Sequence, residues 1–214
     1  MDRWSIGILL ALIAIGGIAL YVSPKPLMHL QDATSLVQTS PDSIEIIPGT
    51  PSIAYTDASF KFTIVHPVSA LMQTSGFEGY LPTTQTPVVG FALPESLFAG
   101  TNLGDAGVYI GATSSPRVVA TCTNPSSADG ETLVGDMVVD GAAFKITIST
   151  GVGAGNIYDA TSYRTVREGT CFEVVELLHS SNIANYTPGT VTQFDRQKIS
   201  AMLDLMTQTF VFTR

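Results

Sequence analysis

The sequence has few basic residues, few histidines and only two cysteines. This composition disfavours nucleic-acid binding and metal binding. Ten lysines and arginines stand against 18 aspartates and glutamates, so the net charge at pH 7 is −8. An acidic chain without a basic cluster repels nucleic-acid phosphates, so we expect no nucleic acid among its partners. The three histidines, His29, His66 and His179, are far apart, and neither cysteine lies near one at metal-ligand spacing. We therefore predict no metal site and no cofactor.

Motifs of common enzyme classes are also missing. The string from Gly111 to Ser115 lacks the second glycine of the G-x-S-x-G elbow that positions a nucleophilic serine. The glycine-rich run from Gly151 to Asn156 lacks the Lys-Ser/Thr pair of a phosphate-binding loop, and we interpret it as a connection between strands. We predict no catalytic residue. A hydrolase would need a site assembled from parts of the chain that are distant in sequence.

One long apolar run is present, at the N-terminus. Residues Ser5–Val22 carry no charge, and a helix of these 18 residues would span roughly 27 Å, close to the hydrocarbon core of a bilayer. Trp4 and Tyr21 lie at its two ends, where amphipathic rings favour the membrane interfaces. We predict that residues 1–22 form a transmembrane anchor, with membrane lipid as its partner.

A cleaved signal peptide is the alternative, because the run is only just long enough to span a bilayer and Gly17 and Ala19 offer small residues for cleavage. No cysteine follows the run closely, which excludes a lipid-modified cysteine there. With an anchor, the chain is a single-pass protein of the cytoplasmic membrane. Its C-terminal domain then faces the periplasm or the cell exterior, where an envelope protein is the expected kind of partner.

The two cysteines, Cys122 and Cys171, both lie in strand-like surroundings. Neither belongs to a C-x-x-C pair, which disfavours redox catalysis. In an exported domain we expect a disulfide between them, and closing a loop of about 50 residues would stabilise the fold by roughly 4 kcal/mol at most. Two unrelated buried thiols are the alternative.

The remaining chain divides into a tether and one domain. Residues 23–55 mix proline, serine and threonine without a sustained period, which is typical of a tether, although Ile44–Ile47 could be a first edge strand. Residues 56–214 have the length of one ordinary domain. Strand patterns occur in this part at 59–64, 87–93, 107–112 and 142–149.

The strongest local signals lie in the last third of the chain. Two strand patterns flank Glu168-Gly169, which predicts a hairpin with a tight turn. Asp195 can cap a helix whose apolar residues recur at i, i+3, i+4 and i+7 from Ile199, and an apolar strand follows at 209–212. The run 117–123 fits a strand or a short helix. Since most connections are too short for helical crossovers, we predict an α+β domain with a mostly antiparallel sheet flanked by helices.

Two glutamates, Glu173 and Glu176, lie three apart in the second strand of this hairpin, so on a regular strand they face opposite sides. Glu176 would then share its side with Phe172, Val174 and Leu178, which is unusual for a carboxylate. Three interpretations stay open for this pair: a solvent-facing sheet edge, a structural charge pair, or a functional residue.

The C-terminal segment DRQKISAMLDLMTQTFVF, a helix leading into a strand with a T/S-F-x-F pattern, resembles the ending of PsbP-like domains. FKFTIVHP resembles their first strand, while FAGTNLGDAGVYI and AGNIYDATSYRTVREGTCFEVVELLHSSNIANY resemble uncharacterised exported bacterial proteins. The resemblance covers about residues 55–214 and implies an α/β/α sandwich used in accessory and binding roles. The best-known PsbP-like proteins assist photosystem II or bind a small GTPase in nuclear import, but none of their functional residues matches a position here.

We therefore expect a non-catalytic accessory or binding module, tethered to the membrane outside the cytoplasm, with an unknown ligand. The alternatives are an envelope hydrolase whose site forms only in three dimensions, and a small subunit of an envelope assembly. A deep pocket where a histidine meets a serine or a carboxylate would favour the hydrolase, whereas a shallow apolar patch would favour the binding module.

Overall fold

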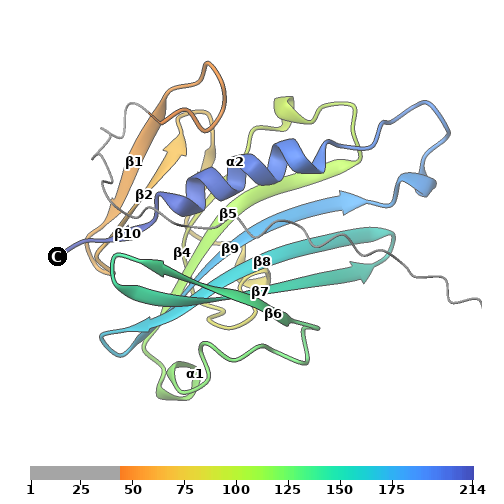
Figure 1. Ribbon diagram of the computed structural model, residues 1–214. Helices are drawn as coiled ribbons and strands as arrows, with labels where there is room; N and C mark the ends of the chain where they lie inside the picture. The colour runs from red at the N-terminus through yellow and green to blue at the C-terminus, as the bar shows by residue number, and fades with distance from the viewer. Residues whose placement is uncertain (1–43) are drawn as a thin grey trace, which may run out of the picture. The chain divides into compact units, whose positions relative to one another are not determined.

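Seven antiparallel strands form the main sheet, in the order β3-β4-β5-β9-β8-β7-β6 (Figure 1). The computed structural model describes residues 44–214. The strands of the main sheet are Leu71–Gln73 (β3), Pro87–Ala92 (β4), Leu103–Thr113 (β5), Thr132–Val139 (β6), Ala142–Gly153 (β7), Asn156–Arg167 (β8) and Thr170–Ser181 (β9). A three-stranded sheet joins Ser52–Asp57 (β1), Phe62–Pro67 (β2) and Val211–Phe212 (β10) in the order β1-β2-β10.

Tight turns connect the four strands from β6 to β9 into a meander. Each turn has two residues with positive φ: Asp140 and Gly141 (47° and 76°), Ala154 and Gly155 (49° and 83°), and Glu168 and Gly169 (50° and 74°). Two-residue turns of this kind match the right-handed twist of the strands, and they fix the register of each hairpin. The predicted hairpin around Glu168-Gly169 is confirmed, with pairing from Asn156↔Ser181 to Arg167↔Thr170.

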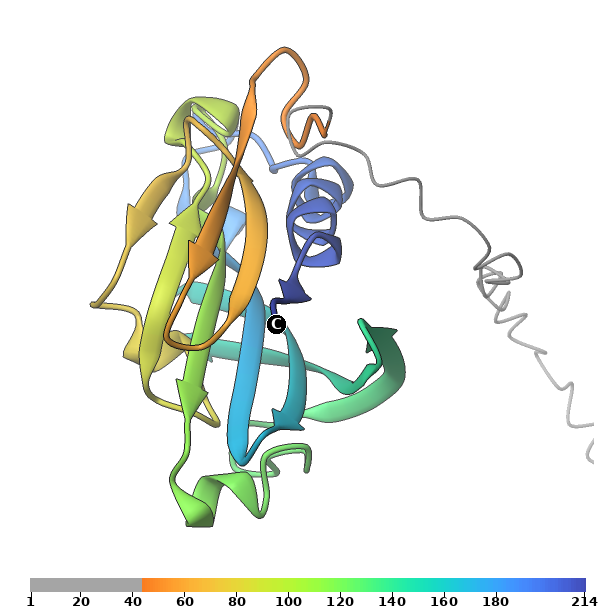
Figure 2. The same cartoon turned by 90° about the vertical axis from the view of Figure 1, so that its left-hand side faces the viewer.

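The only long helix among the described residues, α2 (Arg196–Gln208), lies across one face of the main sheet (Figures 1 and 2). Asp195 caps it as predicted, since its Oδ1 accepts a hydrogen bond of 3.0 Å from the Lys198 amide. The predicted apolar stripe is buried: Ile199, Met202, Leu203 and Met206. We call this side of the sheet the helix face. It holds most of the hydrophobic core, including Phe62 of β2 and Phe210, which directly precedes β10.

The opposite side, which we call the loop face, is covered by connecting segments rather than by a long helix. It receives alternate residues of β9, namely Cys171, Glu173, Val175 and Leu177, while Phe172, Val174, Glu176 and Leu178 point to the helix face. The covering segments contain three short helices: α1 (Pro116–Val119), η2 (Glu78–Tyr80) and, near one end of the sheet, η4 (Ile183–Asn185). A fourth, η3 (Glu95–Leu97), follows β4.

The structure confirms an α+β domain on a mostly antiparallel sheet and corrects parts of the prediction. A second helical layer, as in the expected α/β/α sandwich, is not found within residues 44–214, because loops and helices of three or four residues cover the loop face. The expected strand at 59–64 lies slightly later, as β2. Of the two alternatives for the run 117–123, the short helix holds, since α1 covers its first residues.

The folded part begins earlier than the expected boundary at residue 56. Ile46 and Ile47 are buried in the core, with 1% and 6% of their surface exposed, and β1 starts at Ser52. Residues 44–55, expected in the tether, therefore belong at least in part to the domain. The predicted anchor over residues 1–22, with Trp4 and Tyr21, lies outside the described residues. Among residues 44–214, none of the helices is both long and apolar enough to cross a membrane.

Candidate functional site

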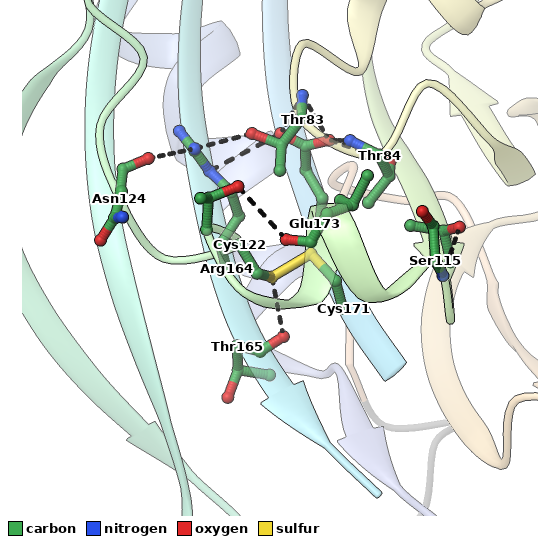
Figure 3. Close-up of a disulfide and its surroundings, with 12 residues drawn as sticks. Thr83, Thr84, Ser115, Cys122, Asn124, Arg164, Thr165, Cys171 and Glu173 are labelled. Atoms are coloured by element: carbon green, nitrogen blue, oxygen red, sulfur yellow. Dashed lines mark hydrogen bonds and ion pairs between the residues drawn. A yellow bond between two sulfur atoms is a disulfide. The ribbon is translucent and has the colours of Figure 1, made fainter. Parts of the chain in front are cut away.

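A buried arginine lies at the centre of the loop face. Arg164 projects from β8 opposite Glu173 of β9, and both side chains are almost fully buried, at 1% and 0% exposure (Figure 3). The Arg164 Nε and the Glu173 Oε1 are 3.6 Å apart. Burying two charges is costly unless hydrogen bonds satisfy them, so the groups around this pair decide whether it is stable.

Glu173 is satisfied mainly by the segment between β3 and β4. The amides of Thr83 and Thr84 donate to its carboxylate, at 3.2 Å and 2.8 Å for Oε2, and the Thr84 hydroxyl donates to the same oxygen at 3.0 Å. Gly111 of β5 lies beneath this contact, because a Cβ at that position would collide with the Thr84 hydroxyl. The glycine therefore lets the segment approach the sheet closely enough to bind the carboxylate.

Arg164 is satisfied mainly by the segment between α1 and β6. Its Nη1 donates to the Asn124 carbonyl at 3.1 Å and to the Thr83 hydroxyl at 2.7 Å. Its Nη2 donates to the Thr147 hydroxyl at 2.6 Å and forms an ion pair with the buried Glu131 carboxylate. One guanidinium thus connects two strands with both segments that cover the loop face, as Figure 3 shows in part.

The predicted disulfide between Cys122 and Cys171 is present beside this cluster (Figure 3). It joins the segment after α1 to β9, two residues before Glu173. The segment from residue 122 to residue 131 is therefore fixed to the sheet by a covalent bond at one end and by Glu131 at the other. This double attachment gives the segment a defined position over the loop face.

Burial raises the pKa of Glu173, while the Thr84 amide and the Arg164 charge act in the opposite direction. Two carboxylates, Glu131 and Glu173, share this one cation within the cluster. The cluster is a structural clamp, since its hydrogen bonds hold both loops; the Arg164 Nε has no hydrogen bond within the described residues and meets Glu173 only as an ion pair.

Between the two clamped segments lies a groove of about 680 Å³, which we call the loop-face groove. Its floor consists of loop-face residues of β7, β8 and β9, including Ser149, Tyr158 and Leu177. One wall is Gly79, Tyr80 and Pro82 of the segment after β3, and the other is Ala128, Asp129 and Gly130 of the segment after α1. No lysine or arginine lines it.

Two tyrosines give the groove flat apolar surfaces held in place from behind. The Tyr80 ring packs edge-on against the buried Tyr109, at 5.0 Å between centroids, and the Tyr158 ring stacks on His179 at 4.4 Å. Tyr109 is itself fixed by a hydrogen bond of 3.0 Å to Asp105. Because both rings are supported, the groove presents them without ordering flexible side chains on binding.

A second hollow of about 410 Å³ adjoins the groove and shares Pro82 and Ala128 with it. It continues along the segment after α1, where Arg117 lines it. Asp129 lines the first hollow and Arg117 lines the second. A ligand that reaches from one hollow into the other must pass Pro82 and Ala128, which an extended chain can do.

The described histidines are not arranged as catalytic bases. The His179 Nε2 lies 3.2 Å from the Asn156 side-chain oxygen, and the His66 Nδ1 lies 2.9 Å from the Pro67 carbonyl. Burial lowers the pKa of His66, whose ring stacks on Phe91. Within residues 44–214 neither ring has a hydrogen bond to a serine hydroxyl or a carboxylate, and no group of three metal-binding side chains occurs there either.

The cysteines could be predicted from the sequence, but the buried position of Arg164 between the loops could not. Arg164 alternates with apolar residues in TSYRTVR, which is also the pattern of a solvent-facing position, and only the cover formed by distant segments buries it. The strand alternation correctly separated Glu173 from Glu176, but both lie in the central strand β9 and not at a sheet edge. For Glu173, the structural charge pair is the interpretation that holds.

Comparisons with known proteins find solved structures in which the chain follows a similar path. No protein-family model matches the sequence, and no curated protein matches it. A cyanobacterial PsbP from Synechocystis sp. PCC 6803 is similar in structure, with a TM-score of 0.42, 11% identity and coverage of 75% of this chain and 92% of its own.

Two further structures are similar at the same level. LpqN of Mycobacterium tuberculosis, described as involved in cell envelope biogenesis, has a TM-score of 0.43 and 9% identity, over 78% of this chain and 92% of its own. A protein from Bacteroides thetaiotaomicron has a TM-score of 0.41 and 11% identity, and the match covers 78% of this chain but 50% of that protein. At these values the likeness assigns no function.

Proposed function

We propose that this chain is a non-catalytic binding module that receives an extended peptide segment of an envelope protein in the loop-face groove. The observation that carries the proposal is the clamp at Arg164, which holds both walls of the groove to the sheet. A preformed groove needs little ordering when it binds, which favours recognition.

The lining indicates the chemistry of the segment. Supported aromatic rings, a wall proline and small residues at Gly79, Gly151 and Ala160 suit an extended backbone with small or proline side chains. The acidic Asp129 lines the groove and the chain has a net charge of −8, so a neutral or basic segment is favoured over an acidic one. The adjoining hollow with Arg117 would accept a polar or acidic end of the same segment.

The test is selection of peptides from a displayed random library on the full chain in lipid nanodiscs. We expect enrichment of extended neutral or basic peptides that bind Tyr80→Ala and Tyr158→Ala variants roughly tenfold more weakly, as is usual for central aromatic contacts. Tyr186→Ala is the matched control, because Tyr186 lies outside the groove. The proposal is wrong if no peptide is enriched, or if the enriched peptides bind all three variants equally.

We also propose that residues 1–22 hold the module in the cytoplasmic membrane with the domain outside the cytoplasm. The uncharged run Ser5–Val22, flanked by Trp4 and Tyr21, supports this. In spheroplasts, added protease should digest the domain while alkaline extraction leaves the intact protein in the membrane fraction. A soluble mature chain that lacks its first residues would instead establish signal-peptide cleavage, and a protease-resistant domain would place it in the cytoplasm.

A further inference from the structure

A separate hollow of about 210 Å³ lies on the helix face, beneath the N-terminal half of α2. We call it the helix-face pocket. Its polar side chains come from four elements: Ser149 and Thr150 of β7, Asp159 and Thr161 of β8, Glu176 of β9, and Arg196 and Ser200 of α2. The pocket shares Ser149, Thr150 and Ala160 with the lining of the loop-face groove, but the aromatic rings of that groove, Tyr80 and Tyr158, do not line it.

Glu176 brings an unsatisfied oxygen to this pocket. Only 7% of its surface is exposed, and its Oε1 has no hydrogen-bond partner in the described part of the chain. The contrast with Glu173 is direct, since that carboxylate accepts hydrogen bonds from Thr83 and Thr84. An unsatisfied buried acceptor destabilises a fold, and a site for a ligand is one reason for keeping it.

The charges around the pocket leave Glu176 without a cation. Arg196 is already paired with Asp159, at 2.7 Å between the Arg196 Nη2 and the Asp159 Oδ2. The other ionisable groups that face Glu176 are Tyr163 from β8 and Asp204 from α2, and neither can supply a positive charge. A ligand that completes this site must therefore bring the positive charge itself, and an anion is excluded by the same carboxylates.

We propose that the helix-face pocket binds a small primary ammonium compound, whose positively charged nitrogen donates a hydrogen bond to Glu176. An ammonium group has three donors in a compact arrangement, which suits a carboxylate together with the hydroxyls of Thr161 and Ser200 that line the same space. A volume of about 210 Å³ admits a molecule of a few heavy atoms and excludes a long polyamine.

Because Glu176 is protonated in the free protein, binding of an ammonium compound should release a proton that can be measured. Burial, with the negative charge of Asp204 adding to it, raises the pKa of Glu176 to about 8. The free protein therefore holds a proton on this carboxyl at pH 7. When an ammonium ion binds, the carboxylate forms and the proton passes to the buffer, so that each bound ligand releases up to one proton.

The test is isothermal titration calorimetry of the full chain with ethylammonium chloride and with glycine at pH 7, in two buffers that differ in ionisation enthalpy. We expect saturable binding with proton release for at least one of the two compounds. Glycine carries a carboxylate beside its ammonium group, and Arg196 in the lining is the one cation that could pair with it in place of Asp159. Binding of glycine alone would identify an amino acid as the ligand class and would still support the ammonium site. Tetramethylammonium has the charge but no N–H donor, and it should not bind.

Two variants separate the site from a general effect of cations. Glu176→Gln keeps the shape of the protonated side chain and should weaken binding roughly tenfold or more and abolish proton release. Ser200→Leu fills the space from α2 and should also abolish binding. Glu168→Gln, at an exposed hairpin turn, and Tyr158→Ala, in the loop-face groove, should leave amine binding unchanged.

Three results would overturn the proposal. They are the absence of saturable binding by either compound, equal binding by tetramethylammonium, and unchanged binding in folded Glu176→Gln protein. None of them bears on the peptide groove, whose test uses other residues on the other face.

Discussion

Replacing Glu176 by glutamine is expected to make the protein more stable than the wild type, by a difference that grows as the pH rises from 5 to 8. The carboxyl is buried at 7% exposure, without a hydrogen bond to its Oε1 within residues 44–214, and its pKa is raised from 4.5 to about 8. The groups that face it are Asp204 and Thr207 from α2 and Tyr163 from β8, and none of them is a cation. In the folded protein it therefore stays protonated at a pH where the unfolded chain has lost the proton.

The sign and size follow from proton linkage. Between pH 4.5 and about 8 the folded state binds one proton more than the unfolded state at this residue, so the free energy of unfolding falls as the pH rises. The largest slope is about 1.4 kcal/mol per pH unit, which gives a loss of a few kcal/mol by pH 8. Glutamine does not titrate, so the variant should escape this loss. Below pH 4.5 the two proteins should be nearly equal in stability.

Urea unfolding followed by circular dichroism, at intervals from pH 4 to pH 8.5, measures the effect as the difference between wild type and variant. The difference cancels the contributions of titrating groups that do not interact with Glu176. Glu168→Gln at the exposed hairpin turn is the control, and its curve should run parallel to that of the wild type. If the Glu176→Gln curve is also parallel to the wild type over this range, the carboxyl is ionised in the fold and the reasoning about its burial is wrong.

Three further predictions concern the parts that hold the domain together. Arg164→Met leaves Glu131 and Glu173 buried without their cation and should lower the free energy of unfolding in urea by about 3–5 kcal/mol, whereas a loss below about 1 kcal/mol would contradict the clamp. Replacing both Cys122 and Cys171 by alanine should cost roughly 3–4 kcal/mol for a sequence separation of 49, and limited proteolysis should then cut first between residues 122 and 131. Asp195→Ala removes the cap of α2 and should cost about 1 kcal/mol in thermal unfolding, while Gln197→Ala at an exposed position of the same helix serves as its control.

The elements that the sequence predicted are those whose stability is local. The β8–β9 hairpin depends on its own turn residues, and α2 depends on its cap and its apolar stripe, so both can be read from short windows. By contrast, β3 has three residues and β10 has two, and such strands exist only because a neighbouring strand pairs with them. The start of the domain was placed too late for a similar reason. Ile46 and Ile47 are buried by contacts with the core rather than by any periodic pattern of their own.

The candidate sites were harder to predict because they depend on contacts between distant residues. Arg164 meets Thr83 across 81 positions and Asn124 across 40, and nothing in its own strand indicates that it is buried. The cysteines were an exception, since the sequence contains two and an exported domain favours their oxidation. The grooves and pockets form between elements that no local pattern brings together.

The two glutamates of β9 show how one strand can serve two purposes. Because side chains alternate along a strand, a spacing of three places Glu173 on the loop face and Glu176 on the helix face, at nearly equal burial. Glu173 is matched by a guanidinium and by donors from Thr83 and Thr84, so its charge is used to hold the segment that forms one wall of the groove. Glu176 has no cation beside it and opens onto a hollow. Equal burial with unequal compensation is the reason to assign a structural role to the first carboxylate and a ligand to the second.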